Sequence, residues 1–311
     1  MNRQRPNRRI LAAALASAVV ATLVAVAAPA AGQGGAENAP RPHSATASVR
    51  VMDTAFAMPE LGRTRRVWIY LPPDYASSQK TYPVLYMHDG QNVFDAATSY
   101  AGEWGVDEAL DSLHAAGDPG VIVVAVDNGQ QQRMNEYSPW VHPEHGGGQG
   151  AAYADFLANT LKPHVDRSYR TRPGPESTGI MGSSMGGLIS LYAALRHPGV
   201  FGRVGVFSPS LWFSDSVFVA ARAGVASGPR PRMYFVSGGK EGPGTAPRIV
   251  VVAQQRMIDT LAAAGWTVGT DVLAAAPDDG EHNEWFWRRE FPAAYRWLFA
   301  DPAAPAPNRL D

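Results

Sequence analysis

The sequence predicts an α/β fold, in which one mostly parallel sheet of eight strands carries helices on both faces. Short β-branched and apolar runs alternate with helical stretches along most of the chain, which is typical of parallel strands joined by crossover helices. Four runs are apolar almost throughout, as expected of strands covered on both faces: 84–86, 121–126, 204–207 and 233–236. The region 48–300 has a size that α/β folds commonly fill as one domain.

The predicted strands, in chain order, cover 48–52, 66–71, 84–88, 121–126, 179–182, 204–208, 233–236 and 268–273. The segment 66–71 alternates less regularly than a strand buried on both faces, which suits an antiparallel position near the sheet edge. Between the strands, helices are expected at 106–116, 153–161, 185–197 and 249–264. A final aromatic helix is expected to follow the polar loop 278–285.

The first 31 residues have the features of a secretory signal peptide. Four arginines precede an uncharged run rich in Ala, Val and Leu at 10–31, which ends in small residues. The alternative is a membrane anchor, since the run is long enough to span a bilayer. Residues 32–47 are predicted to be a flexible leader and the Ala/Pro-rich residues 301–311 a flexible tail. The mature chain is therefore expected to be secreted or periplasmic, with no stable membrane association.

Composition excludes several classes of function. The chain has no cysteine, which excludes disulfides, thiolate zinc sites, iron–sulfur clusters and cysteine nucleophiles. It has 27 Lys and Arg against 28 Asp and Glu, and residues 1–31 contain four of the arginines and none of the acids. The mature chain is thus mildly acidic, which argues against nucleic acid as a partner.

The segment 180–188 contains Gly182-x-Ser184-x-Gly186 between an apolar strand and a helix. In that context the motif predicts a nucleophile elbow, a strained turn that holds a serine hydroxyl clear of the sheet. We expect Ser184 to be the nucleophile and the N–H of Met185 to be one oxyanion donor. The alternative is a glycine-rich helix N-terminus capped by Ser183 or Ser184.

A serine on this kind of turn is followed along the chain by an acid and then by a histidine. Only His197 and His282 follow Ser184. His197 ends a helix just before Pro198, where a histidine commonly interacts with the helix dipole. His282 lies in a polar loop after the last strand, so it is the predicted general base.

Glu241 is the favoured acid because it comes just after the carboxyl end of the penultimate strand, where α/β sheets carry their chemistry. Its role would be to accept the Nδ1–H of the histidine and so fix the tautomer. Asp215 is the alternative. A solvated turn without a catalytic role also remains open for Glu241.

Several segments together resemble the "putative esterase" family of α/β-hydrolases, whose members include siderophore, feruloyl and acetyl-xylan esterases and S-formylglutathione hydrolases. The resemblance runs from about Arg65 to Phe299 and rests on five matches: VLYMHDGQNVFD at 84–95, EYSP at 136–139, GSSMGG at 182–187, FSPSLW at 207–212, and the loops of Glu241 and His282. It implies a second oxyanion donor in the loop after 84–88. Gln91 is favoured for that donor and Gly90 is the alternative, while His88 and Asp89 are expected to shape the loop.

Tryptophans near these loops suggest a substrate with a planar or sugar-bearing group, because rings stack on both. Trp212, Trp140 and Trp285 are the candidates for substrate binding, against the alternative that they belong to the core. The stretch 142–145 contains two histidines and a glutamate but lacks zinc-motif spacing, so no metal is expected.

The sequence thus predicts an exported serine esterase that hydrolyses carboxylic esters through Ser184, His282 and Glu241 and needs no cofactor. The small-molecule ester could be a siderophore, an aromatic acyl ester or a carbohydrate ester. Two alternatives stay open, namely an acyltransferase with the same triad and a binding module on the same fold.

Overall fold

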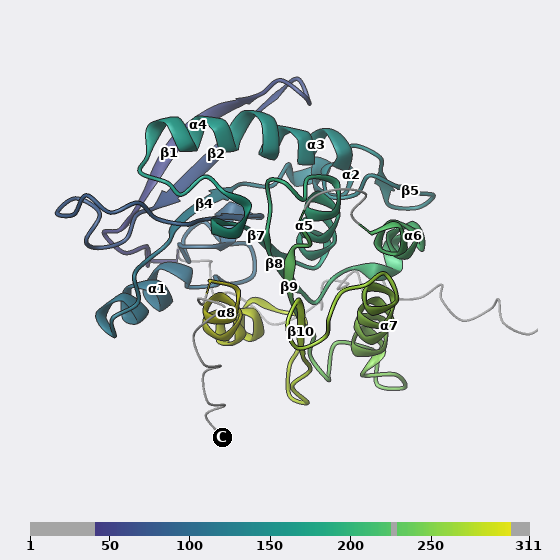
Figure 1. Cartoon of the computed structure of the whole chain (residues 1–311). Helices are drawn as coiled ribbons and strands as arrows, with labels where there is room; N and C mark the ends of the chain where they lie inside the picture. Colours follow the sequence, from purple (N-terminus) through teal and green to yellow (C-terminus); the bar gives the residue numbers. More distant parts are fainter. Residues whose placement is uncertain (1–40, 225–228, 300–311) are drawn as a thin grey trace, which may run out of the picture. The chain divides into compact units, whose positions relative to one another are not determined.

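The computed structural model describes residues 41–224 and 229–299. The predicted signal peptide (1–31), residues 32–40 of the leader and the tail (301–311) lie outside the described residues. Eight strands form one sheet in the order β1-β2-β4-β3-β7-β8-β9-β10 (Figure 1). They are β1 (Val49–Met58), β2 (Arg63–Tyr70), β3 (Val84–Met87), β4 (Ile122–Val126), β7 (Thr178–Ser183), β8 (Arg203–Phe207), β9 (Arg232–Val236) and β10 (Val272–Ala275).

The predicted fold class is confirmed. Only the pairings of β1 with β2 and of β2 with β4 are antiparallel, and the remaining strands of this sheet run parallel. Strands β3 and β4 are buried along their whole length, and β8 and β9 at every residue except the first, as their apolar sequences predict. The active-site loops expected from the sequence all follow the carboxyl ends of parallel strands.

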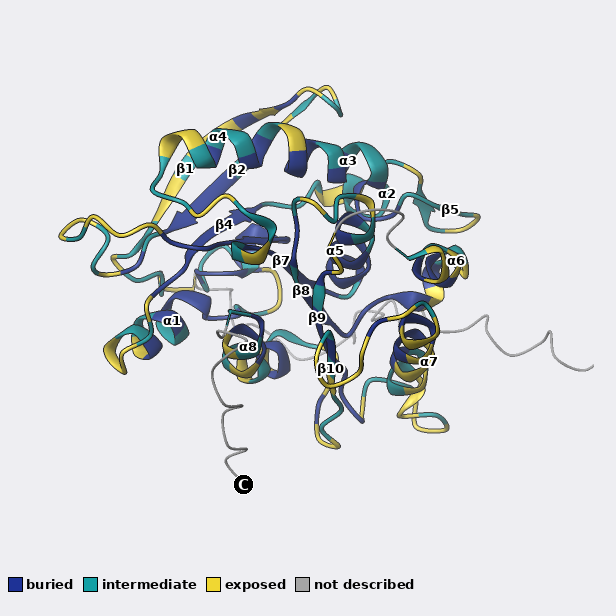
Figure 2. Cartoon of the chain, viewed as in Figure 1, coloured by how far each residue is buried: buried dark blue, intermediate teal, exposed yellow. Residues whose placement is uncertain are grey.

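Helices cover the sheet on both faces (Figures 1 and 2). Residues of α1 and α8 join one apolar core with the sheet, and residues of α3, α5, α6 and α7 join the other. The helices are α1 (Val106–Ala115), α2 (Arg133–Glu136), α3 (Gly150–Phe156), α4 (Lys162–Ser168), α5 (Met185–Arg196), α6 (Ser216–Ala223), α7 (Ile249–Ala263) and α8 (Glu284–Phe299). Short 3-10 turns are η1 (Gly90–Asn92), η2 (Gln130–Gln132), η4 (Pro175–Ser177) and η5 (Leu211–Phe213).

The last strand begins later than predicted. The sequence suggested 268–273, whereas β10 covers Val272–Ala275. The reason is a turn before it: the N–H of Asp271 donates to the carbonyl of Thr267, and the Asp271 carboxylate accepts the N–H of Thr267. Gly269, at φ 91°, provides the left-handed residue inside this turn.

Two further differences concern regular structure. The predicted helix 153–161 is part of a longer run in which a π-helical turn, η3 (Leu157–Leu161), joins α3 to α4. The glycine-rich stretch after Trp140 contains a two-stranded hairpin of β5 (Val141–His142) and β6 (Gly146–Gly147), which was not among the predicted strands.

Residues 41–47, which belong to the predicted leader, contact the loop between β3 and α1. The Ser44 hydroxyl accepts the N–H of Ala96 at 2.7 Å and donates to Glu103 at 2.6 Å. His43 Nδ1 lies 2.7 Å from Asp95 Oδ2. This part of the chain is therefore fixed to the domain by side-chain hydrogen bonds. Within 41–224 and 229–299, no helix is long and apolar enough to cross a membrane.

Candidate active site

Ser184 occupies a sharp turn between β7 and α5, with φ 59° and ψ −122°. A positive φ is uncommon for a residue other than glycine and indicates local strain. The turn is fixed from both sides, since the Ser184 N–H donates to the carbonyl of Phe207 at 2.9 Å and its carbonyl accepts the N–H of Leu188 at 3.1 Å. A Cβ on Gly182 would lie 2.9 Å from the backbone of Gly186, so only glycine fits this close approach. These are the features predicted from the sequence motif.

His282 and Glu241 are bonded to each other, with His282 Nδ1 3.0 Å from Glu241 Oε2. The Glu241 side chain is fully enclosed, whereas 39% of the His282 side chain is exposed. The second carboxylate oxygen, Oε1, accepts the Ser208 hydroxyl at 2.6 Å and the backbone N–H of Gly238. The carboxylate is thus satisfied on both oxygens and cannot rotate freely.

Close backbone packing brings the acid loop and the histidine loop together. A Cβ on Gly238 would lie 2.2 Å from the backbone of Gly280, so this approach requires glycine. On the other side, the ring of Trp287 meets the His282 ring edge-on, with centroids 5.2 Å apart. The imidazole is therefore held between Glu241 and an indole.

The loop after β8 lies between the nucleophile and the acid. Ser210 donates its N–H to the Ser184 carbonyl at 3.0 Å, and the Ser210 and Ser184 hydroxyl oxygens are 3.2 Å apart. Two residues earlier, Ser208 bonds Glu241. In the described part of the chain the Ser184 hydroxyl is bonded to Ser210 and not to His282. Hydrogen bonds of this kind often tighten only in the complex with substrate.

The other acid and histidine considered from the sequence lie elsewhere. Asp215 precedes α6, has 81% of its side chain exposed, and pairs with Arg256 at 2.9 Å. His197, at the end of α5, pairs with Asp155 at 2.8 Å. Neither is bonded to a residue around Ser184, so the structure brings Glu241 rather than Asp215 to His282.

The loop after β3 carries the two candidates for the second oxyanion donor. Gly90 and Gln91 lie in η1, and a Cβ on Gly90 would lie 2.8 Å from the backbone of Val126. The Gln91 side chain is fixed, because its Oε1 accepts the N–H of Asn128 at 3.1 Å. Among the described residues, no acceptor is bonded to the N–H of Gln91, of Gly90 or of Met185. Both candidates for the second donor, and Met185, therefore have a backbone N–H without an acceptor among the described residues.

His88 and Asp89 shape this loop. Burial lowers the pKa of His88 to about 3, so its imidazole is neutral, and Nδ1 lies 3.0 Å from the Tyr153 hydroxyl. Asp89 is in the left-handed region, at φ 55°. Its carboxylate is bonded to Arg133 and Asn128, two residues that no motif in the sequence marks.

The three tryptophans singled out in the sequence have different surroundings. Trp212 lies in η5, is 46% exposed, and meets His142 and His145 edge-on with centroids 5.9 and 5.5 Å away. Trp140 packs against Tyr192 with centroids 5.5 Å apart and borders the core. Trp285 is 55% exposed and stacks under the guanidinium of Arg289. Ser210, whose hydroxyl contacts that of Ser184, lies two residues before Trp212. Among the three tryptophans, Trp212 is therefore the one closest in sequence to a residue that contacts Ser184.

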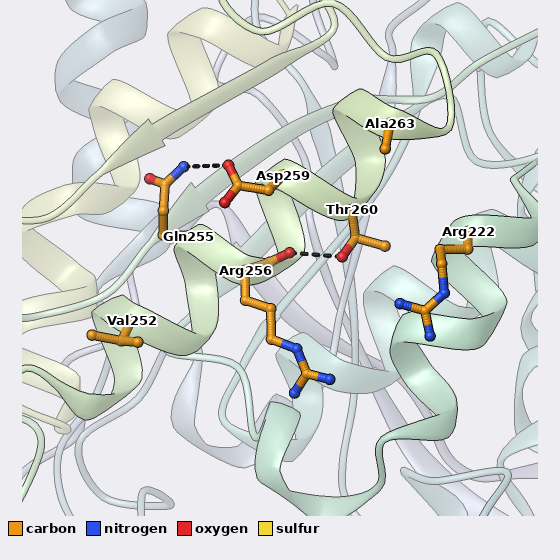
Figure 3. A pocket seen from close by; sticks show the side chains of 7 residues that line it. All are labelled: Arg222, Val252, Gln255, Arg256, Asp259, Thr260 and Ala263. Carbon is orange, nitrogen blue, oxygen red and sulfur yellow. Dashed lines mark hydrogen bonds between the residues drawn. The ribbon is translucent and has the colours of Figure 1, made fainter. Parts of the chain in front are cut away.

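A separate groove lies between α6 and α7 (Figure 3). Arg222, Arg256 and Asp259 are among the residues that line it, and it contains none of the predicted site residues. Among residues 41–224 and 229–299, no group of three or more His, Asp or Glu is placed to hold a metal ion.

The fold is that of an α/β-hydrolase. The family model described as "Putative esterase" matches residues 58–298, which is most of the chain. The chain therefore belongs to this family and is a carboxylic ester hydrolase.

The chain is also similar to individual proteins and to solved structures. The uncharacterized protein YbbA of Bacillus subtilis is 26% identical over 245 residues, covering 76% of this chain and 92% of that protein. An iron(III) enterobactin esterase of Dickeya dadantii is 27% identical over 263 residues, which is 79% of this chain but only 54% of the relative. Among solved structures, an IroE-like serine hydrolase of Shewanella oneidensis superimposes with a TM-score of 0.63 at 21% identity, covering 81% of this chain and 79% of the other.

Proposed function

We propose that the protein is an exported serine esterase in which Ser184, His282 and Glu241 form the catalytic triad. The observation that carries the proposal is the bond between His282 Nδ1 and the enclosed Glu241 carboxylate, which the loop after β8 links by hydrogen bonds to a strained serine at a strand-to-helix turn. An enclosed carboxylate at Nδ1 keeps that nitrogen protonated and leaves Nε2 as the base.

In the first half-reaction, Ser184 Oγ attacks the ester carbonyl carbon while His282 Nε2 takes the hydroxyl proton. The tetrahedral oxyanion accepts hydrogen bonds from the N–H of Met185 and of Gln91, or of Gly90 in its place. The carbonyl re-forms, the alcohol leaves with the proton from His282, and the acyl group stays on Ser184. Water then attacks the acyl-enzyme by the same steps and releases the acid.

The substrate is proposed to carry a planar ring, with Trp212 as its stacking surface. Trp212 is half-exposed, and Ser210, two residues before it, contacts Ser184. Enterobactin and feruloyl esters, named for relatives of this chain, contain such rings. Trp285 is a further candidate, while Trp140, packed on Tyr192, would act at the border of the site.

Export is proposed from the sequence of residues 1–31 alone. The mature domain would then act outside the cytoplasm. N-terminal sequencing of the protein recovered from culture medium or periplasm tests this part separately.

The decisive experiment measures p-nitrophenol release from acetate, butyrate and octanoate esters, together with labelling by a serine-directed fluorophosphonate read by intact mass. We expect turnover and a single label in the wild type, and neither in Ser184→Ala. Ser183→Ala is the matched control, since it removes the neighbouring hydroxyl and should keep both. Glu241→Gln should lower kcat by roughly 10²–10⁴-fold, as expected when the orienting acid of a triad is lost.

Two results would contradict the proposal. If the folded wild type neither turns over nor takes the label, the triad does not operate and a binding role becomes the better interpretation. If activity persists in Ser184→Ala, another nucleophile is used. Product analysis with added methanol separates hydrolysis from acyl transfer.

A further inference from the structure

Asp89 places a carboxylate beside the helix that follows the nucleophile. The residue is buried, has left-handed backbone angles of φ 55° and ψ 47°, and directly precedes the turn that carries Gly90 and Gln91. A Cβ on Gly186, in the first turn of α5, would lie 3.4 Å from Asp89 Oδ2. A bare negative charge at this position would repel an oxyanion formed at Ser184.

Arg133 forms a bidentate salt bridge with this carboxylate. Its Nε donates to Asp89 Oδ1 at 2.6 Å and its terminal Nη2 donates to Oδ2 at 2.9 Å. Asn128 Nδ2 donates to Oδ1 at 2.6 Å, and the Asp89 N–H donates to the Tyr137 hydroxyl at 3.1 Å. Burial alone would raise the pKa of Asp89, but the charge and hydrogen bonds of Arg133 outweigh it and the pKa is lowered.

We propose that Arg133 is a positioning residue for the ester hydrolysis, acting through Asp89 on the loop that donates to the oxyanion. Its fork holds Asp89 in the left-handed turn, and its charge cancels the carboxylate beside the reacting carbonyl. The inference rests on the proposed function, because the benefit of a neutral environment appears only when an oxyanion forms.

Two further titratable side chains, His88 and Glu284, lie near Asp89. His88 is neutral, as described above, and so supplies no positive charge. Glu284, at the start of α8, faces the same region: its carboxylate accepts a long hydrogen bond from Asn92 Nδ2 at 3.5 Å. Burial and then the Asp89 charge raise the pKa of Glu284, while His282 and Arg133 lower it. Without Arg133, the carboxyl groups of Asp89 and Glu284 would both face the oxyanion loop without the charge that Arg133 supplies.

The test compares Arg133→Gln, Asp89→Asn and the double variant. Arg133→Gln should lower kcat for p-nitrophenyl butyrate by about 100-fold with little change in KM, on the scale of losing one oxyanion donor. The double variant has no bare carboxylate, so it should regain at least about 10-fold over Arg133→Gln, since removing both partners of a buried pair is milder than removing one. Arg196→Gln is the matched control, because Arg196 makes the same fork to Asp155, at 2.7 and 2.9 Å, at the far end of α5.

A second measurement does not require catalysis. Hydrogen exchange of peptides covering 88–95 should become faster in Arg133→Gln and stay unchanged in Arg196→Gln. If Arg133→Gln fails to fold, Arg133→Lys, which keeps the charge but loses the fork, replaces it and should show a smaller loss of kcat. An inactive, unlabelled wild type would refute the proposed function, and the exchange data would still report on the loop.

The inference is overturned by any of three results: kcat of Arg133→Gln equal to that of Arg196→Gln, unchanged exchange at 88–95, or a double variant no more active than Arg133→Gln. The last result would mean that the Asp89 charge is not the source of the loss.

Discussion

Trp287 donates its indole N–H to the hydroxyl of Ser208 at 2.8 Å, and that hydroxyl donates in turn to Glu241 Oε1 at 2.6 Å. Ser208 has a φ of 42°, so the hydroxyl is presented from a strained backbone position. The indole fixes the direction of the Ser208 hydrogen, because a hydroxyl that accepts from one side donates to the other. The orientation of Glu241 therefore depends on a helix residue five positions after His282.

Trp287→Phe should keep the ring that packs on His282 but lose the hydrogen bond to Ser208. We expect kcat to fall by about 3- to 10-fold, the effect of one neutral hydrogen bond, with KM nearly constant. Steady-state kinetics on p-nitrophenyl butyrate measures it. Trp297→Phe serves as control, because Trp297 packs against Arg232 and Tyr234, outside the site. An equal loss in both variants would show that general packing, not the bond, is responsible.

Gly238→Ala should separate the acid loop from the histidine loop. The added methyl would overlap the backbone of Gly280, and two backbones cannot move apart without shifting Glu241 from His282. We expect kcat to fall by at least about 100-fold, because a displacement near 1 Å at the reacting groups costs that much. Gly199→Ala is the control, since a Cβ there meets nothing within 4 Å. Wild-type kcat in Gly238→Ala would mean that the loops tolerate the added volume.

The buried His88 should make the fold sensitive to acid. Burial lowers its pKa to about 3 from the ordinary 6.5, so between these values the folded protein binds fewer protons than the unfolded chain. The stability is therefore complete above pH 6.5 and falls as the pH drops towards 3. The His88 share of the loss between pH 7 and pH 5 should be about 2 kcal/mol.

Urea unfolding of the wild type and of His88→Gln at both pH values measures that share. The variant should be less stable at pH 7 but lose less stability on going to pH 5. Parallel losses in the two proteins would show that His88 is not the group responsible.

Ser44→Ala should destabilise the domain although it lies close to the N-terminal end of the described chain. The hydroxyl bridges the N–H of Ala96 and the carboxylate of Glu103, and both would lose a partner. We expect the free energy of unfolding to fall by about 1–3 kcal/mol. Ser77→Ala removes an exposed hydroxyl bonded to a neighbouring carbonyl and should cost far less. Equal effects in the two variants would argue that the Ser44 hydroxyl contributes nothing to stability.

Much of the fold followed from sequence because strands buried on both faces are apolar almost throughout, as the runs in β3, β4, β8 and β9 are. The site residues Ser184 and His282 could be selected because one motif and one chain order restrict them. The start of β10 could not be predicted, since the turn around Asp271 depends on side-chain bonds to the backbone. The hydrogen bonds of Arg133, Ser208 and Ser210 could not be predicted either. They join loops that are distant in the sequence, and the strand order that brings those loops together is not encoded in any local sequence pattern.

The β8 loop joins the two halves of the proposed machinery, with Ser208 bonded to the acid and Ser210 bonded to the nucleophile. The number of residues between Ser208 and Ser210 therefore sets the distance between the acid and the nucleophile. If a residue were inserted between Ser208 and Ser210, the loop could not form both hydrogen bonds at the same time. An insertion after Gly242 should leave both bonds intact. We therefore expect insertions that reshape the substrate pocket to be tolerated only in loops outside this short stretch.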